Sequence, residues 1–372
     1  MTGTETEPDP DPQPKKFNMV QSKLTSAFFA PKHANTTSPH FTKPAIGPSD
    51  PQDAEPEKAT EKATTGVAKL NLHPERRSNL NRPPPSLGPP RRSAMLAHVA
   101  AENKALLPNV LRMTPNAPAH GTLYDPSTLV RLDPKHCPKL SPTKIRVLNA
   151  DSIDAALSLS SRTAVTPSTP TNKPVLILNM ANAYHSGGGW LNGALAQEEA
   201  LCYRSSLSFT LKNKYYPIPE AGGIYSPTVL VIRESMAQGH NLLDLSKPDD
   251  LPVVSCVSVA AIRGPYMVKD SGGVDMYYYA KDRETMKEKM RVVLRIAAVG
   301  KHSVLVLGAL GCGAFGNPRV EVVQCWKDVF RETEFGGGWW ETVVFAVMEK
   351  EEDKDGEGNF GVFWRGLDGI EV

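Results

Sequence analysis

The sequence lacks the cysteine patterns that hold zinc or build a disulfide framework. Only five cysteines occur among its 372 residues, and no two of them form a CxxC pair. An odd number of widely scattered cysteines suits a reducing compartment better than a secreted protein with paired thiols. We therefore expect no disulfide framework, no metal site and no bound cofactor. The cysteines are Cys137, Cys202, Cys256, Cys312 and Cys325.

Long apolar runs and an excess of one charge are also missing. No stretch approaches the roughly 18 apolar residues of a membrane span, and the N-terminus has no apolar segment typical of a signal peptide. The 42 basic and 40 acidic residues leave a formal net charge of +2, which gives no reason to expect a broad nucleic-acid surface. The sequence predicts a soluble, intracellular protein of the nucleus or cytoplasm without membrane contact. An anionic ligand would need a local site.

Residues 1–92 have the composition of a disordered tail. They hold about half of the 33 prolines and almost no periodic apolar pattern, so they cannot bury enough surface to offset the entropy of ordering. Within this tail, residues 19–32 form an apolar island around Leu24 and Phe28. The distance in sequence from Leu24 to the aromatic pair that begins at Phe28 is one residue longer than in peptides that bind DNA sliding clamps. The island is therefore either a partner motif or a chance cluster. The basic segment 75–92 is either a nuclear import signal or a solvated linker.

Beyond the tail, apolar segments of strand length alternate with helical patterns. Ser93 can cap a helix that opens an extension, residues 93–140, which we expect to pack on the main domain. Several later segments are near-continuous valine, leucine and isoleucine runs, as in strands buried on both faces. We therefore predict a three-layer α/β/α fold with a mixed, mainly parallel central sheet over residues 141–372. The predicted strands are 145–150, 174–181, 228–234, 252–261, 303–310 and 342–349, and the predicted helices are 197–212, 282–299 and 318–333.

Three consecutive glycines, Gly187, Gly188 and Gly189, follow the buried segment 174–181. In open α/β sheets ligands bind where the strands end, so this location suits a site. Glycines there let backbone N–H groups approach a phosphate closely through left-handed conformations. Taken alone, the triplet could be a flexible linker. The helix that follows begins with two acids after Gln197, which could simply favour the positive end of the helix dipole.

A second glycine-rich loop, from Gly308 to Arg319, follows the segment 303–310 and leads into the next helix. Two such loops suggest two walls around one pyrophosphate, with backbone donors in place of basic side chains. Neither loop has the GxxxxGK[ST] pattern of a P-loop, and neither is followed by the acidic residue of a dinucleotide fingerprint. The pattern therefore predicts an anion site and disfavours P-loop chemistry and hydride transfer.

The glycine triplet, seven further residues and then QEE resembles the signature of poly(ADP-ribose) glycohydrolases. The segments ALAQEEALCYRSSL, YYPIPEAGGIYSPTVLVIRE, VVSCVSVAAIRGP and GALGCGAFGNPRV are similar to the microbial branch of that family, in the same order. The resemblance spans about residues 93–365. It implies a macrodomain-like catalytic domain, a part in the DNA damage response, and hydrolysis of the ribose–ribose O-glycosidic bonds of poly(ADP-ribose) with release of ADP-ribose.

The resemblance also implies a role for each matching residue. Glu199 takes the place of the catalytic acid, and Glu198 that of the residue that holds a ribose hydroxyl. Adjacent residues on a helix point about 100° apart, so one acid and one positioning group fit better than an acid and a nucleophile. The two glycine loops would embrace the diphosphate, and Phe315 would lie over the terminal ribose. The substrate-binding residues implied in this way are Asn182, Gly187, Gly188, Gly189, Gln197, Gly311, Cys312, Gly313, Ala314, Phe315, Gly316 and Asn317.

Other functions of the same pocket stay open at this stage. The protein could cleave a different ADP-ribosyl linkage, on protein or nucleic acid, with ADP-ribosylated proteins as partners, or it could only bind ADP-ribose as a reader. A reader has no need of the second acid, which favours the enzyme. For adenine stacking the candidates are Phe345 and Phe360. The run Tyr277 to Tyr279 is either a half-buried strand or a pocket rim, and His185 is either a base or an exposed loop residue.

Overall fold

The computed structural model of this protein describes residues 91–160 and 173–372. The expectations for the first 90 residues, namely disorder, the clamp-binding island and the import signal, lie outside this range. No helix within the described range is long and apolar enough to cross a membrane. The helices are α1 (Arg92–Met113), α2 (Ser152–Leu159), α3 (Gln197–Arg204), α4 (Leu207–Thr210), α5 (Ala280–Val299), α6 (Arg319–Phe330) and α7 (Asn359–Leu367). The strands are β1 (Thr122–Tyr124), β2 (Arg146–Leu148), β3 (Leu176–Met180), β4 (Gly223–Leu230), β5 (Val253–Val259), β6 (Met267–Lys269), β7 (Asp275–Tyr277), β8 (Val304–Leu307) and β9 (Thr342–Ala346).

Seven of the described strands form one mixed sheet in the order β1-β4-β5-β3-β8-β9-β2. The run from β5 to β2 is parallel throughout, whereas β4 and β1 add antiparallel pairs at one edge. β3 lies inside the parallel part, between β5 and β8. The carboxyl ends of the parallel strands therefore point to one edge of the sheet, where ligands bind in folds of this class.

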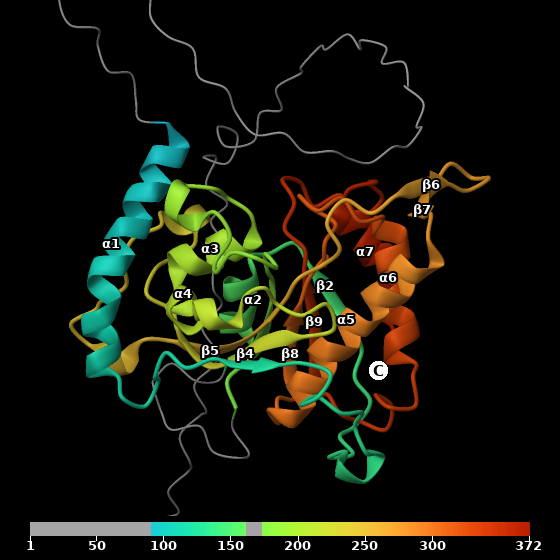
Figure 1. The fold of residues 1–372 in the computed structure, drawn as a ribbon, viewed down its shortest axis with the longest axis horizontal. Coiled ribbons are helices and arrows are strands. Elements are labelled where there is room, and N and C mark those ends of the chain that lie inside the picture. Colours follow the sequence, from blue (N-terminus) through green and yellow to red (C-terminus); the bar gives the residue numbers. More distant parts are fainter. Residues whose placement is uncertain (1–90, 161–172) are drawn as a thin grey trace, which may run out of the picture. The chain divides into compact units, whose positions relative to one another are not determined.

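Helices cover both faces of the sheet and complete three layers (Figure 1). Side chains of β3 alternate between the two layers, since Leu176 and Leu178 join the core that contains α5, α6 and α7, whereas Ile177 joins the core that contains α2, α3 and α4. Burial on both faces explains why the strand sequence is almost continuously apolar. The predicted three-layer fold with a mixed, mainly parallel sheet is confirmed.

Two predicted elements differ from the structure at polar or proline positions. The helix expected over 197–212 is interrupted at Ser205, whose backbone is extended and pairs with Val231, directly after β4. Serine hydroxyls compete with helical hydrogen bonds, and Ser205 Oγ accepts the backbone N–H that would begin the next turn. The strand expected at 228–234 begins earlier, at Gly223, and its register shifts around Pro227, which has no N–H for the ladder.

The extension predicted over 93–140 contains one α-helix, α1, and a short 3-10 helix at Pro134–His136, and the chain after α1 contributes β1 to the sheet. Prolines follow soon after the helix and prevent its continuation. α1 packs against α3, because Asn103 Nδ2 donates to the Tyr203 carbonyl of α3 at 2.6 Å. A Cβ on Gly193 would lie 1.8 Å from the carbonyl oxygen of Ser93, so α1 touches this loop directly. The extension therefore braces α3.

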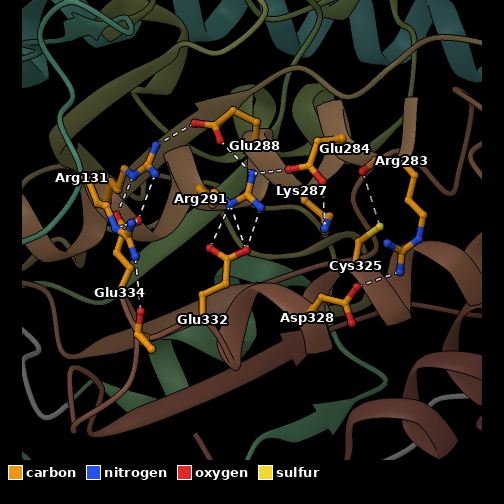
Figure 2. A network of polar contacts seen from close by, with 12 residues as sticks. Arg131, Arg283, Glu284, Lys287, Glu288, Arg291, Cys325, Asp328, Glu332 and Glu334 are labelled. Atoms are coloured by element: carbon orange, nitrogen blue, oxygen red, sulfur yellow. Dashed lines mark hydrogen bonds and ion pairs between the residues drawn. The ribbon is translucent and has the colours of Figure 1, made fainter. Parts of the chain in front are cut away.

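A network of ion pairs fastens α5 to the segment that follows α6 (Figure 2). Arg291 donates to both oxygens of Glu332, at 2.7 to 3.0 Å. Arg295 pairs with Glu334 at 2.7 Å, and the Glu334 side chain is only 2% exposed. Leu132 adds a backbone N–H to the same carboxylate at 3.0 Å. Since α6 begins beside the second glycine loop and runs away from it, this network stabilises the end of the domain remote from that loop.

Candidate active site

Both predicted glycine loops leave the same edge of the sheet. Residues 181–196 follow β3, residues 260–266 follow β5, and residues 308–318 follow β8. These three strands are parallel neighbours, so the loops after them begin side by side. The carboxyl edge of the sheet therefore gathers the first glycine loop, the second glycine loop and the N-terminus of α3.

The first glycine loop folds closely against the two acids that begin α3. Gly187 and Gly188 have φ angles of +71° and +59°, the left-handed region that favours glycine. A Cβ on Gly188 would lie 2.3 Å from Oε1 of Glu199 and 3.0 Å from Oε2 of Glu198. Both carboxyl groups therefore reach the same glycine, although adjacent helical residues leave the helix in different directions. Only glycine permits this approach.

Glu199 is held by backbone N–H groups on both sides. Its Oε1 accepts from Gly189 at 2.9 Å, and its Oε2 accepts from Ala196 at 2.9 Å. Ala196 directly precedes α3, so the second bond satisfies a donor at the helix start. Glu199 is 8% exposed. The two bonds fix this carboxyl group between the glycine triplet and the helix.

Glu198 lies deeper and has one side-chain donor. Its Oε2 accepts from the Asn182 N–H at 2.8 Å, and its Oε1 accepts from Asn179 Nδ2 at 3.2 Å. Burial raises the pKa of Glu198 to about 8, and the bonds from Asn182 and Asn179 limit that rise. Asn179 also donates to the Ser258 hydroxyl at 3.0 Å. Sequence reasoning missed Asn179, whose only signal is a polar residue inside an apolar strand.

Two predicted substrate ligands shape the loop through their own hydrogen bonds. The Gln197 amide accepts from the Met180 N–H at 2.9 Å and donates to the Leu178 carbonyl at 2.7 Å, which joins the start of α3 to the end of β3. Asn182 Oδ1 accepts two backbone N–H groups of its own loop, at 2.8 and 3.0 Å. Both residues thus position the acids, and their contacts with substrate stay predictions.

The second glycine loop has a packed part and an open part. A Cβ on Gly311 would lie 2.5 Å from Asn317 Nδ2, and this amide donates to the Gly311 carbonyl at 3.1 Å. By contrast, a Cβ on Gly313 or Gly316 would meet nothing within 4 Å. Phe315, between them, is half-buried. The open backbone leaves room for a ligand, although its contact with a diphosphate stays a prediction.

Tyr277 supports the second loop from the side. Its hydroxyl donates to Asn317 Oδ1 at 2.9 Å, and its ring is buried. The predicted tyrosine run therefore divides, since Tyr277 ends a strand whereas Tyr278 and Tyr279 are exposed beyond it. Within the described ranges, no group of three or more histidine, cysteine, aspartate or glutamate side chains is placed to hold a metal ion.

The predicted adenine partners are wrong. Phe345 is 0% exposed and Phe360 is 1% exposed, and both rings belong to the core, so neither has a face open to a ligand. Cys312 is buried as well, and burial raises its pKa to about 12, which suits an apolar packing role. His185 is exposed in its loop.

Comparison with known proteins connects this geometry to a family. Residues 109–234 match the family model of the catalytic domain of microbial-type PARG, where PARG is poly(ADP-ribose) glycohydrolase. The predicted resemblance is confirmed. The PARG match contains the glycine triplet and both acids, whereas the second glycine loop lies beyond it. No curated protein matches the chain.

Solved PARG structures resemble a larger share of the chain. The PARG of Thermomonospora curvata is 25% identical, with a TM-score of 0.55, over 73% of this chain and 99% of that one. A structure of the same enzyme bound to the inhibitor ADP-HPD has 25% identity and a TM-score of 0.54 over the same shares. The PARG of Deinococcus radiodurans in complex with ADP-ribose is 26% identical, with a TM-score of 0.50, over 66% of this chain and 94% of that one. These similarities support a glycosidase.

Proposed function

We propose that this protein hydrolyses the ribose–ribose O-glycosidic bonds of poly(ADP-ribose) and releases ADP-ribose. The PARG family match and the resemblance to PARG structures with ADP-ribose or ADP-HPD support the substrate class. The observation that carries the proposal is the approach of Glu198 and Glu199 to one left-handed glycine at the carboxyl edge of a parallel sheet. This arrangement places two acids beside a backbone that can receive phosphate.

In this proposal the glycine loops hold the diphosphate of one ADP-ribose unit. Backbone N–H groups can donate to phosphate oxygens without a basic side chain, in keeping with a formal net charge of only +2. The open space around Gly313 and Gly316 suits a close approach of phosphate to backbone. Phe315 would cover the terminal ribose, and Asn182 would bind one of its hydroxyl groups.

Glu199 would serve first as general acid and then as general base. As the glycosidic C–O bond breaks, the departing ribose oxygen takes the proton of Glu199, and the anomeric carbon gains oxocarbenium character. The resulting carboxylate then accepts a proton from water while the water oxygen bonds to the anomeric carbon. This second step restores the acid and completes hydrolysis, and it requires no enzyme nucleophile.

Glu198 would position the ribose. With a pKa of about 8, its carboxyl keeps a proton in most molecules at neutral pH and can donate a hydrogen bond to a ribose hydroxyl oxygen. A neutral Glu198 also avoids a second negative charge beside the diphosphate. The two acids would thus differ in role because their surroundings differ, despite their adjacency on α3.

Product analysis distinguishes this proposal from its alternatives. Purified protein is incubated with poly(ADP-ribose) and, separately, with a mono-ADP-ribosylated protein, and the products are separated by chromatography. Release of ADP-ribose from the polymer is the expected result. Release from the mono-ADP-ribosylated protein alone would favour a hydrolase of another linkage, and binding without release would favour a reader.

The role of the acid is tested by Glu199→Gln. We expect kcat to fall by about a hundredfold or more, with ADP-ribose affinity nearly unchanged, because the amide keeps the shape but cannot deliver the proton. Glu357→Gln serves as the matched control, since Glu357 is an exposed acid whose carboxylate pairs with Arg365 on the surface at 3.0 Å. Turnover of Glu199→Gln equal to that of the control would overturn the assignment.

A further inference from the structure

A short hairpin projects from the sheet edge that carries the proposed site. β6 and β7 pair antiparallel as a separate two-stranded sheet, after the loop that follows β5 (Figure 1). Two strands of three residues are too short to be stable alone. Hydrogen bonds to the second glycine loop hold the hairpin instead: Gly264 N–H donates to the Phe315 carbonyl at 2.8 Å, and Asn317 Nδ2 donates to the Ile262 carbonyl at 2.7 Å. Tyr277 adds its bond to Asn317.

Three tyrosines of this hairpin form an exposed group, which we call the tyrosine cluster (Tyr266, Tyr278 and Tyr279). Their exposed fractions are 73%, 62% and 50%. The Tyr279 ring contacts Tyr266 and Tyr278 edge to face, with centroid distances of 5.9 and 4.8 Å. At least half of the surface of each residue therefore faces solvent and is open to a ligand. Clustered exposed aromatic rings mark a binding surface more often than isolated ones do.

A cation accompanies the tyrosine cluster at the base of the hairpin. Arg263 is exposed, and it forms no hydrogen bond or ion pair with any residue in the described ranges. Lys269, at the far end of β6, is already paired with Asp275 at 2.9 Å. Arg263 therefore offers an uncompensated positive charge three residues before Tyr266 and directly before Gly264, which bonds to the second glycine loop. Stacking rings together with a cation suit a ligand that carries bases and phosphates.

We propose that the tyrosine cluster is a second binding subsite for the polymer, which stacks on an adenine of a unit outside the glycine-loop pocket while Arg263 contacts a phosphate. The inference rests on the proposed function and names how a long substrate is held. The hydrogen bonds to Phe315 and Asn317 connect this surface to the loop that would hold the first unit. The tyrosine cluster would therefore increase affinity for chains and leave affinity for free ADP-ribose unchanged.

Affinity for two ligand lengths tests the proposal. We compare the wild-type protein with a triple variant, Tyr266→Ala, Tyr278→Ala and Tyr279→Ala, by measuring Kd for free ADP-ribose and for a long labelled polymer, and kcat/KM on the polymer. The triple variant should bind the polymer at least about tenfold more weakly, the loss expected for one stacked base, and should bind ADP-ribose as before. Replacing the same tyrosines by phenylalanine should preserve polymer affinity, because the ring does the stacking. Arg263→Ala should weaken polymer binding and make it less dependent on salt.

Controls separate this proposal from its alternatives. Val130→Ala removes an exposed apolar side chain far along the chain from the hairpin and should change neither affinity. Equal polymer affinity of the folded triple variant and the wild type would overturn the subsite. Sedimentation that shows a dimer in the wild type and a monomer in the triple variant, without a change in polymer affinity, would also overturn it and assign the surface to a second copy. Failure of the wild type to cleave polymer that it binds would instead refute the proposed function, whereas weaker polymer binding by the triple variant would still support the subsite.

Discussion

Gly188→Ala is the substitution with the sharpest structural consequence. The new methyl group would lie 2.3 Å from Glu199 Oε1, whereas ordinary contacts begin at 3.4 Å, so the carboxyl group must retreat by about 1 Å. That movement breaks or stretches the bond from the Gly189 N–H, which is 2.9 Å long in the structure. The contact with Glu198 Oε2, at 3.0 Å, is also too short. One methyl group would therefore displace both acids.

Two energies determine the expected size of the effect. A left-handed φ of +59° costs an alanine about 1 kcal/mol, and loss of a buried hydrogen bond costs about 1 to 2 kcal/mol. We therefore expect the free energy of unfolding to fall by about 2 to 3 kcal/mol. Misplacement of a catalytic group by about 1 Å lowers turnover by about a hundredfold. At low temperature, the loss of kcat in Gly188→Ala should thus be larger than the loss that a partly unfolded population would cause.

Urea unfolding and polymer hydrolysis are measured on the same preparations. Gly369→Ala is the matched control, since Gly369 has a φ of +79° and a Cβ there would meet nothing within 4 Å. This control should lose about 1 kcal/mol of stability through backbone strain and keep its activity. If Gly188→Ala retained kcat within about threefold of that control, the close approach of Gly188 to the acids would not matter for catalysis.

Three further perturbations probe the acids, the fold and the tail. Burial raises the pKa of Glu198 from 4.5 to about 8, so between these pH values the folded state keeps a proton that the unfolded chain releases. The free energy of unfolding should therefore fall by up to about 1.4 kcal/mol for each pH unit as the pH rises through this interval. Glu198→Gln should remove this pH dependence in urea unfolding. Glu334→Gln should cost about 3 kcal/mol, against less than about 1 kcal/mol for the surface control Glu357→Gln. Although burial opposes it, the bonds from Arg295 hold the pKa of Glu334 below 4.5, so the stability that this ion pair adds is present above that pH and lost as the pH falls. If Glu334→Gln and the wild type lost stability equally as the pH falls below 4.5, the assignment would be wrong. Removal of residues 1–90, which leaves α1 whole, should change kcat/KM on free polymer by less than about tenfold, because the composition of this segment suits a tether. A larger loss would mean that the segment contributes to substrate binding or catalysis.

The features of this protein that could be predicted are those that depend on residues close together in the sequence. Apolar runs predicted the central strands because burial on both faces requires side chains that lose nothing on leaving water. The triplet from Gly187 to Gly189 indicated a loop of left-handed backbone, since other residues pay steric strain there. The acids that follow were recognisable because their spacing from the glycines is itself part of the signature. Proline and serine positions, such as Pro227 and Ser205, were misjudged because their effect depends on the partner strand.

Only the tertiary structure determined the burial and the hydrogen-bond partners of each acid. Glu198 and Glu199 are adjacent and chemically equivalent in the sequence, yet Glu198 is buried beside Asn179, which raises its pKa to about 8. The same holds for the aromatic rings, since Phe345 is sealed in the core whereas Tyr279 is exposed on a hairpin. Sequence determines which groups are available and where the backbone can turn. Burial and the proximity of distant donors arise only when separate strands and loops meet, because desolvation and hydrogen bonding depend on every neighbour in space.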